Sequence, residues 1–389
     1  MKWNNKGHQF DEVGEKLTKM FKEKDGVWIF GAGIYGKDLR TLFSKYEFSC
    51  FKGFIDNNAN KKNEITDCEV CLFDEYIDRG GNDWIVIAAE GVHVAEIQKQ
   101  LEDKGKIKNE DFFDIDYFLS FIFPVISMYA FDKLYTRIGQ ISVTERCTLK
   151  CKKCAHGCYA VDNSRDDMNI NDVFISSDYF FKAFDYVTEF SLLGGEPLLY
   201  KELIEAIEYI GSEYRNQMVT FSVTSNGTIF PSDQLIDVMK KHEMLYRISN
   251  YSKVLPRLSK QYEKITNKLK DAGIEYRVRE DFVWSDFGFD HVDRQNNKNE
   301  LIQTFDNCHT GCREIRKNKF YFCVMARSTS ENLGFRVGEE DYLALDICDN
   351  RMNILEYNLG YSEKGYLDMC NFCYGGDVEK HLILAGEQM

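Results

Sequence analysis

Short apolar runs alternate with stretches of helical spacing along the first third of the chain. The runs are rich in the aromatic and β-branched residues that favour strands. They lie at Val27–Phe30, Phe54–Asp56 and Trp84–Ala89. Between the first two runs, Leu39, Leu42 and Phe43 recur at the spacing of one helix face. Strands that alternate with helices favour a parallel sheet, so we expect an α/β domain over residues 1–116.

A second series of apolar runs begins at Ile141, again with helix-like stretches between the runs. These runs lie at residues 141–143, 190–193, 219–224, 245–248 and 275–278. Repeated β–α units are typical of a partial (β/α) barrel, in which the chemistry lies at the C-terminal ends of the strands. We expect the barrel over residues 139–300, after a helical linker at 117–138 and before a small cysteine-rich domain at 301–389.

A glycine-rich turn follows the first predicted strand. Gly31, Gly33 and Gly36 complete a G-x-G-x-x-G pattern, and Asp56 follows the last glycine by about 20 residues. Such glycines let a backbone approach a pyrophosphate at a helix N-terminus, but the same turn also serves sheets that bind no cofactor. GAGIYGKDL with GFIDNN resembles a small Rossmann-like domain often attached to sugar-tailoring enzymes. A nucleotide or nucleotide-sugar ligand is therefore one expectation here, favoured over NAD.

The net charge of −14 argues against a nucleic-acid partner and against an anionic membrane surface. The longest apolar stretch, Tyr117–Phe131, is shorter than the ~20 residues that a membrane-spanning helix needs. The first ten residues lack the apolar segment of a secretory signal. These features predict a soluble cytoplasmic protein.

The 13 cysteines are clustered, which in a reducing cytosol points to metal or redox chemistry. Cys147, Cys151 and Cys154 form a C-x3-C-x2-C loop directly after a predicted strand. Three thiolates on one loop can bind three irons of a 4Fe-4S cluster and leave the fourth iron open for a ligand. A zinc site completed by His156 or Cys158 is the alternative that this loop leaves open.

A second motif favours the cluster. The run 190–193 leads into Gly194, Gly195, Glu196 and Pro197, and the run 219–224 leads into Ser225 and Asn226. Together with the cysteine loop, these segments resemble the radical S-adenosylmethionine (SAM) superfamily. The resemblance implies a partial (β/α)6 barrel in which SAM chelates the open iron and is contacted by Gly194–Pro197, Ser225 and Asn226. Lys153 departs from the family pattern, which usually has an aromatic residue there, and this puts the adenine contacts in doubt.

Further cysteines follow the barrel, at Cys308, Cys312, Cys323, Cys370 and Cys373. They resemble the twitch auxiliary domain, a short relative of the SPASM domain, which holds a second 4Fe-4S cluster. Asn318 stands where that hairpin usually has Gly, a mild change because Asn tolerates a left-handed turn. Cys308 and Cys312 compete for the first ligand position. A zinc ribbon is the alternative for this region.

The resemblance implies an enzyme that reductively cleaves SAM to a 5′-deoxyadenosyl radical, which abstracts hydrogen from a substrate. The electron would come from a flavodoxin- or ferredoxin-type donor. The auxiliary cysteines favour oxidation of the substrate, whereas a thiol such as Cys158 could return hydrogen and give epimerisation.

The N-terminal domain favours a small-molecule substrate, a sugar or nucleotide-linked sugar. A peptide-modifying enzyme is the alternative within the family. A zinc-binding scaffold is the alternative outside it.

Overall fold

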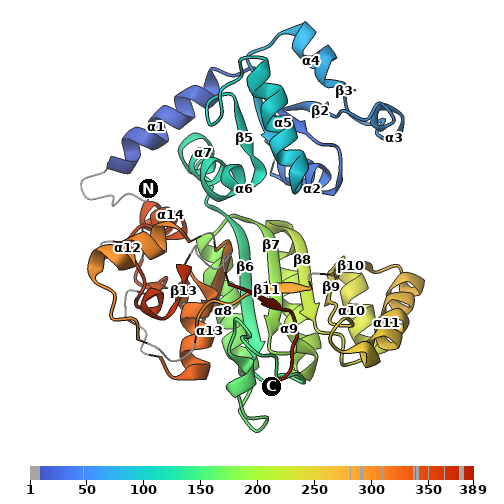
Figure 1. Ribbon diagram of the computed structural model, residues 1–389, viewed down its shortest axis with the longest axis vertical. Coiled ribbons are helices and arrows are strands. Elements are labelled where there is room, and N and C mark those ends of the chain that lie inside the picture. The colour runs from blue at the N-terminus through green and yellow to red at the C-terminus, as the bar shows by residue number, and fades with distance from the viewer. Residues whose placement is uncertain are drawn as a thin grey trace. The chain divides into compact units, whose positions relative to one another are not determined.

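The computed structural model describes residues 9–46, 48–280, 282–289, 293–308, 310–335, 338, 341–348, 350–362, 364–375 and 381–389. The chain divides into two compact units, one ending at Tyr135 and the other running from Thr136 to Met389. Figure 1 labels the elements of both. Among the described helices, none combines the length and the apolar character that a membrane crossing requires.

The N-terminal unit is built on a five-stranded parallel sheet in the order β3-β2-β1-β4-β5 (Figure 1). Its strands are β1 Val27–Phe30, β2 Phe51–Ile55, β3 Val70–Cys71, β4 Trp84–Ile87 and β5 Phe112–Asp114. Every residue of β1 and β4 is buried, as the continuous apolar runs require of strands covered on both faces. The predicted α/β unit with a parallel sheet is confirmed.

Helices accompany this sheet. They are α1 Gln9–Lys22, α2 Ile34–Lys45, α3 Lys61–Glu64, α4 Phe73–Arg79, α5 Val92–Asp103, α6 Ile115–Tyr117, the π-helical η1 Phe118–Ile122 and α7 Phe123–Phe131. The segment expected as a linker is helical only to Phe131, and it belongs to this unit. Tyr129 on α7 donates a hydrogen bond to Asp11 on α1 (2.7 Å), and Phe123 packs edge-on against Tyr135. Up to Tyr135, the apolar stretch therefore packs within the core of this unit.

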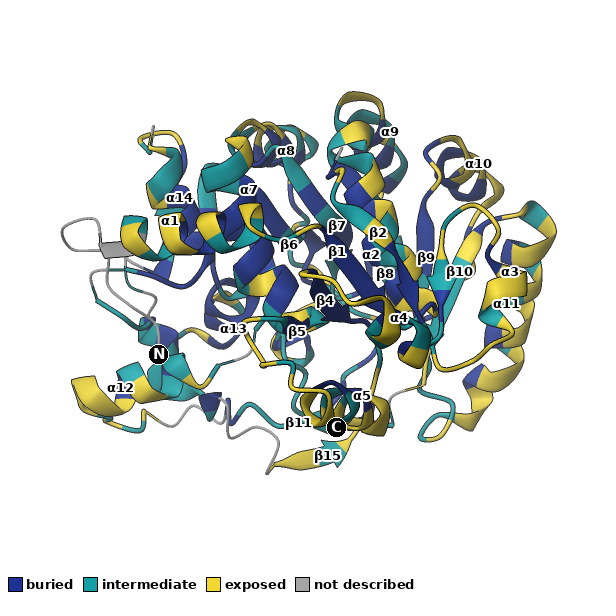
Figure 2. Ribbon diagram, turned by 90° about the horizontal axis from the view of Figure 1, so that it is seen from above, coloured by how far each residue is buried: buried dark blue, intermediate teal, exposed yellow. Residues whose placement is uncertain are grey.

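The second unit contains a sheet in the order β10-β9-β8-β7-β6-β12-β13-β14. Its parallel part includes β6 Tyr135–Thr144, β7 Tyr186–Gly194, β8 Met218–Ser225, β9 Leu245–Ser249 and β10 Glu275–Arg279. The connections carry the 3-10 turns η2 Cys158–Ala160, η3 Pro197–Leu199, η4 Arg215–Gln217 and η5 Pro256–Leu258, and the helices α8 Ile170–Ala183, α9 Leu203–Tyr214, α10 Asp233–Lys241 and α11 Ser259–Ala272. Figure 2 shows β6 to β9 largely buried, whereas β10 and the outer helix faces are intermediate to exposed.

The C-terminal region continues this sheet. β12 Cys312–Arg316 pairs in parallel with β6, and β13 Lys319–Tyr321 and β14 Leu343–Ala344 follow antiparallel. The helices are α12 Lys298–Asp306, α13 Val324–Leu333, α14 Arg351–Asn358 and the 3-10 turn η7 Asp368–Phe372. The expected boundary after residue 300 falls inside α12. In the β12–β13 turn the left-handed residue is Lys317 (φ 53°), and Asn318 instead donates to Asp346, which corrects the expectation for Asn318.

A small separate sheet closes the second unit. β11 Val283–Ser285 pairs antiparallel with β15 Leu382–Leu384, close to the C-terminus. Beyond β15, Gln388 forms an antiparallel bridge with Cys151 in the cysteine loop. The last residues of the chain therefore lie beside the loop that follows the first barrel strand.

Candidate active site

A cavity of about 460 Å³ opens at the C-terminal ends of β6 to β10. Its wall contains the ends of these strands or the residues that follow them, as the barrel pattern predicts. They include Cys147, Cys151, Cys154 and Cys158 after β6, Gly194 and Gly195 at β7, Ser225 and Asn226 at β8, Tyr251 after β9, and Arg279 at β10. The structure thus brings together sequence-predicted residues from three separate segments.

The end of β7 must have glycine because the backbone that enters the cysteine loop lies directly against it. The Gly195 amide donates to the Thr144 carbonyl (2.8 Å), and the Glu196 amide donates to the Arg146 carbonyl (2.9 Å). An added Cβ on Gly194 would lie 2.0 Å from the Thr144 carbonyl oxygen, and one on Gly195 2.1 Å from that of Arg146. Both glycines also line the cavity. They therefore lock β7 against the loop as well as offering backbone to a ligand.

Glu196 lies beneath the cavity wall and is fully buried. Its carboxylate accepts hydrogen bonds from the Ser225 hydroxyl (2.9 Å) and from the amides of Asn226 (2.8 Å) and Leu198 (3.2 Å). Burial raises the pKa of Glu196 to about 7 against the opposing effect of these bonds. The side chain braces β7 against β8, and the adjacent Pro197 is buried at the start of η3. Neither is among the residues of the cavity wall.

The loop cysteines differ in environment. Burial raises the pKa of Cys147 to about 11 and that of Cys151 to about 12. The pKa of Cys154 is lowered to about 6, first because the Cys158 thiol donates a hydrogen bond to it and also because backbone amides point at its sulfur. Cys158 is buried on the cavity wall, with its thiol engaged by Cys154. Among the described residues, no three His, Cys, Asp or Glu side chains are gathered closely enough to hold a metal ion as placed.

Lys153, where the sequence departs from the family pattern, lies on the cavity wall. Lys153 adopts a left-handed conformation (φ 56°), lines the cavity and forms an ion pair with Asp286 (3.1 Å). Asp286 directly follows β11, whose Trp284 and Ser285 also line the cavity. The lysine thus ties the cysteine loop to β11.

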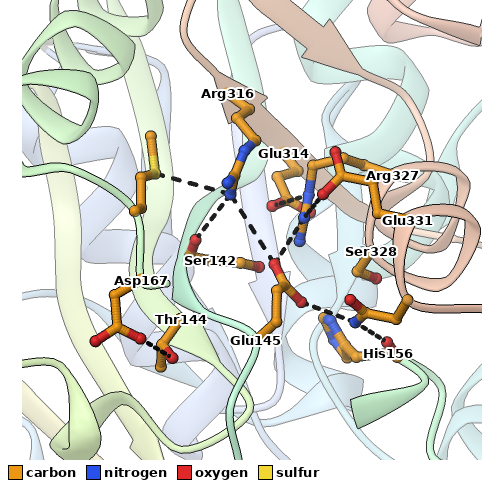
Figure 3. Close-up of polar contacts among 12 residues, drawn as sticks. Ser142, Thr144, Glu145, His156, Asp167, Glu314, Arg316, Arg327, Ser328 and Glu331 are labelled. Atoms are coloured by element: carbon orange, nitrogen blue, oxygen red, sulfur yellow. Dashed lines mark hydrogen bonds and ion pairs between the residues drawn. The ribbon is translucent and has the colours of Figure 1, made fainter. Parts of the chain in front are cut away.

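A buried cluster of charged side chains contacts the start of the cysteine loop (Figure 3). Arg327 on α13 contacts Glu145 (2.7 Å) and Glu314 (2.6 Å), and its side chain is fully buried. Glu145 directly follows the end of β6, at the start of the cysteine loop, and its other oxygen accepts from Asn332 (2.9 Å). Burial would raise the pKa of Glu145, but Arg327 and Asn332 outweigh it and lower that pKa. For Glu314, burial is the stronger effect and raises the pKa to about 7.

Residues 141–278 match the family model described as the Radical SAM superfamily. This part of the chain is similar to a radical SAM domain. The matched range covers the cysteine loop, Gly194–Pro197 and Ser225–Asn226. The match therefore falls on the segments whose residues line the cavity.

Several solved structures resemble the chain. One is BtrN in complex with AdoMet and 2-DOIA, at 12% identity and a TM-score of 0.39, covering 63% of this chain and 89% of that one. Another is anSMEcpe with bound AdoMet, at 12% identity, a TM-score of 0.38 and coverages of 62% and 88%. A third is Streptococcus suis SuiB bound to precursor peptide SuiA, at 13% identity and a TM-score of 0.30, covering 75% of this chain and 86% of that one. No relative was found among curated proteins. Similarities this low do not transfer a substrate.

A second cavity, of about 290 Å³, lies in the C-terminal part of the second unit. Four of the predicted cysteines line it: Cys308, Cys323, Cys370 and Cys373. Cys312 is not among the residues of this wall, because it lies on β12, paired with Ile138 of β6. Burial raises the pKa of Cys323, of Cys370 and, to about 11, of Cys373. The structure therefore gathers thiols from three segments, and it places Cys308 rather than Cys312 with them.

The glycine-rich turn of the N-terminal unit lies between β1 and α2. An added Cβ on Gly36 would lie 2.0 Å from the Gly31 carbonyl, so this glycine serves helix–strand packing, while Gly33 faces open space. The Asp56 carboxylate accepts from the amides of Ala32 (2.8 Å) and Asn58 (2.8 Å). Asp56 therefore stabilises the turn itself, and a nucleotide ligand for it stays a prediction.

Sequence reasoning missed several residues of the active site. Tyr251 and Arg279 follow or end predicted strands, so the rule that places chemistry at strand ends could have found them. Trp284 and Gln388 carry no local signal, because β11 and the C-terminal residues reach the site only through tertiary pairing.

Proposed function

We propose that this protein is a radical SAM oxidoreductase that removes hydrogen from a sugar or nucleotide-linked sugar. The observation that carries the proposal is the single cavity onto which the three loop cysteines, Gly194–Gly195 and Ser225–Asn226 all open. Its volume lies within the range of about 300–1,000 Å³ typical of small-molecule sites.

The residues on this wall fit a cluster and SAM. Cys147, Cys151 and Cys154 would hold the cluster and leave one iron for SAM, and a cluster bound there supplies the electron that cleaves SAM to methionine and the hydrogen-abstracting radical. The backbone at Gly194–Gly195 and the polar groups of Ser225 and Asn226 would orient SAM. Asn226 also donates to the Thr148 hydroxyl (3.1 Å), which fixes the direction of its amide.

The substrate class is supported by the rest of the wall. Tyr159, Tyr251 and Trp284 offer aromatic surface, and the rings of Tyr251 and Trp284 meet edge to face at 5.5 Å. Such surfaces pack against the apolar faces of sugar rings or bases while leaving polar atoms exposed. Arg279 offers a guanidinium, whose planar donors suit a phosphate.

The second cavity supports oxidation over epimerisation. Cys308, Cys323, Cys370 and Cys373 would hold an auxiliary 4Fe-4S cluster without an open iron, suited to accepting an electron from the substrate. Arg313 is buried beside it and donates to the carbonyls of Thr310, Phe322 and Asn358. A buried cation among neutral acceptors is costly, and the negative charge of four thiolates would offset that cost. The Cys158 thiol is engaged in a hydrogen bond with Cys154, and this also favours oxidation over epimerisation.

The test begins with anaerobic reconstitution and iron and sulfide analysis, followed by SAM cleavage with dithionite. We expect about eight irons per chain and 5′-deoxyadenosine. A panel of sugars and sugar nucleotides in D2O then separates the outcomes, because oxidation removes two hydrogens and epimerisation adds solvent deuterium.

Zinc without iron, and no 5′-deoxyadenosine, would overturn the radical SAM assignment for the whole chain. Cleavage stimulated by peptides and by no sugar would overturn the substrate class alone.

A further inference from the structure

The C-terminal residues pair with the loop that carries the cluster cysteines. The Lys152 amide donates to the Glu387 carbonyl (2.6 Å), and the Met389 amide donates to the Lys150 carbonyl (2.9 Å). These bonds flank the antiparallel bridge between Cys151 and Gln388. The main chain alone thus holds Gln388 opposite Cys151.

The Gln388 side chain uses both ends of its amide on this loop. Its Oε1 accepts from the Lys150 amide (2.8 Å), which fixes which way the amide group faces. Its Nε2 then donates to Cys151 Sγ (3.2 Å) and to the Gly386 carbonyl (2.7 Å). Cys151 is buried, so a sulfur in this position has little access to water as a donor.

We propose that Gln388 tunes the reduction potential of the SAM-binding cluster through its hydrogen bond to Cys151. This inference rests on the proposed function, since it needs a cluster on the loop. Reduction adds negative charge to a cluster and its thiolates, so a donor on a ligand sulfur stabilises the reduced state more than the oxidised state. Gln388 acts through Cys151 and is a positioning residue.

The neighbouring Glu387 offers a matched control. Its carboxylate pairs with the Lys152 ammonium (2.5 Å), and both side chains are about half exposed. Glu387→Gln removes this ion pair but leaves the backbone pairing and the Gln388 amide in place. Gln388→Met keeps the length of the side chain and removes both its donor and its acceptor.

The experiment is an EPR redox titration of reconstituted wild type, Gln388→Met and Glu387→Gln. The signal that changes when SAM is added is followed, because SAM binds only the cluster with the open iron. For Gln388→Met we expect the ratio of reduced to oxidised cluster at a fixed potential to fall about tenfold, a midpoint lower by about 59 mV. Glu387→Gln should match wild type.

Each other outcome overturns the tuning role. An unchanged midpoint in Gln388→Met means that the bond to Cys151 does not distinguish the two redox states. Loss of iron in Gln388→Met with full iron in Glu387→Gln means that Gln388 only holds the cysteine loop in place for cluster binding. If wild type itself binds no cluster, the proposed function fails, and that result is visible before any variant is compared.

Discussion

The two cysteine sites of the second unit are assembled in different ways. The first takes Cys147, Cys151 and Cys154 from one short loop at the end of β6. The second takes Cys308, Cys323 and the pair Cys370 and Cys373 from three segments of the chain. A loop can hold ligands on one side and leave the other side open to a substrate, whereas ligands from several directions enclose what they bind. The first arrangement suits a reactive site, and the second suits an enclosed one.

The walls of the two cavities differ accordingly. Around the first, polar groups such as Ser225, Asn226 and Arg279 stand at the strand ends. Around the second, the remaining wall is mostly aromatic and apolar, with Phe289, Phe305, Phe322, Met325, Leu367 and Met369. Apolar surroundings exclude water and lower the local dielectric, conditions under which an electron carrier is shielded from solvent.

One helix connects the sites. α13 begins directly after Cys323, and its far end contacts the first loop, where Thr329 donates to the Ala155 carbonyl and Asn332 donates to the His156 carbonyl (2.7 Å). Arg327 on the same helix is paired with Glu145 at the start of the loop. The two sites are therefore held in one packed framework within the second unit.

The largest loss of activity is expected at the first cysteine site, the loop that follows β6. Cys151→Ala should abolish 5′-deoxyadenosine formation, because the loop cannot hold the cluster with two thiolates, and iron should fall from about eight to about four per chain. Iron analysis and chromatography of the SAM cleavage products measure both effects. Cys50→Ala, in the N-terminal unit, should change neither. Full cleavage activity in Cys151→Ala would contradict the assignment of this loop.

At the second site the expected loss is partial. Cys370→Ala should also lower the iron content to about four per chain, yet 5′-deoxyadenosine should still form, since the SAM-binding loop is intact. The oxidised product should be lost. Cys312→Ala is the matched control and should keep all its iron, because Cys312 is not on the cavity wall. If Cys312→Ala loses iron and Cys308→Ala does not, the ligand set proposed here is incorrect.

The framework between the sites should show a large stability effect. Arg327→Met removes the cation that contacts both buried carboxylates and leaves Glu145 only the more distant Arg316 (3.9 Å); breaking a buried pair costs about 3–5 kcal/mol. The midpoint of urea unfolding of the second unit measures this loss. Lys317→Met, which removes a partly exposed ion pair with Asp172 in the same unit, should leave the unfolding midpoint close to that of wild type. Equal effects of the two variants would refute a special role for the Arg327 cluster.

The smallest effect is expected at the end of α13. Thr329→Val keeps the shape of the side chain but leaves the Ala155 carbonyl without its donor, at a cost of about 1 kcal/mol. The same unfolding measurement detects it, and iron content should remain unchanged. Ser328→Ala, which removes a hydroxyl bonded within the helix, separates a general helix effect from the contact with the loop.

The sequence alone determined the features that are local. Apolar periodicity predicted the parallel strands of both units, and the cysteine loop with Gly194–Gly195 predicted where the strand ends would form a site. Such signals are readable because a strand, a turn or a loop of ligands is specified by neighbours in the chain.

Tertiary structure decided the rest. It turned Glu196 inward as a brace, placed Cys308 rather than Cys312 on the wall of the second cavity, and joined β12 to β6 of the parallel sheet. It also brought Gln388 onto Cys151 across 237 residues of sequence. These outcomes depend on which segments pack together once apolar surface is buried and backbone groups are paired, and no local pattern encodes a partner that lies so far along the chain.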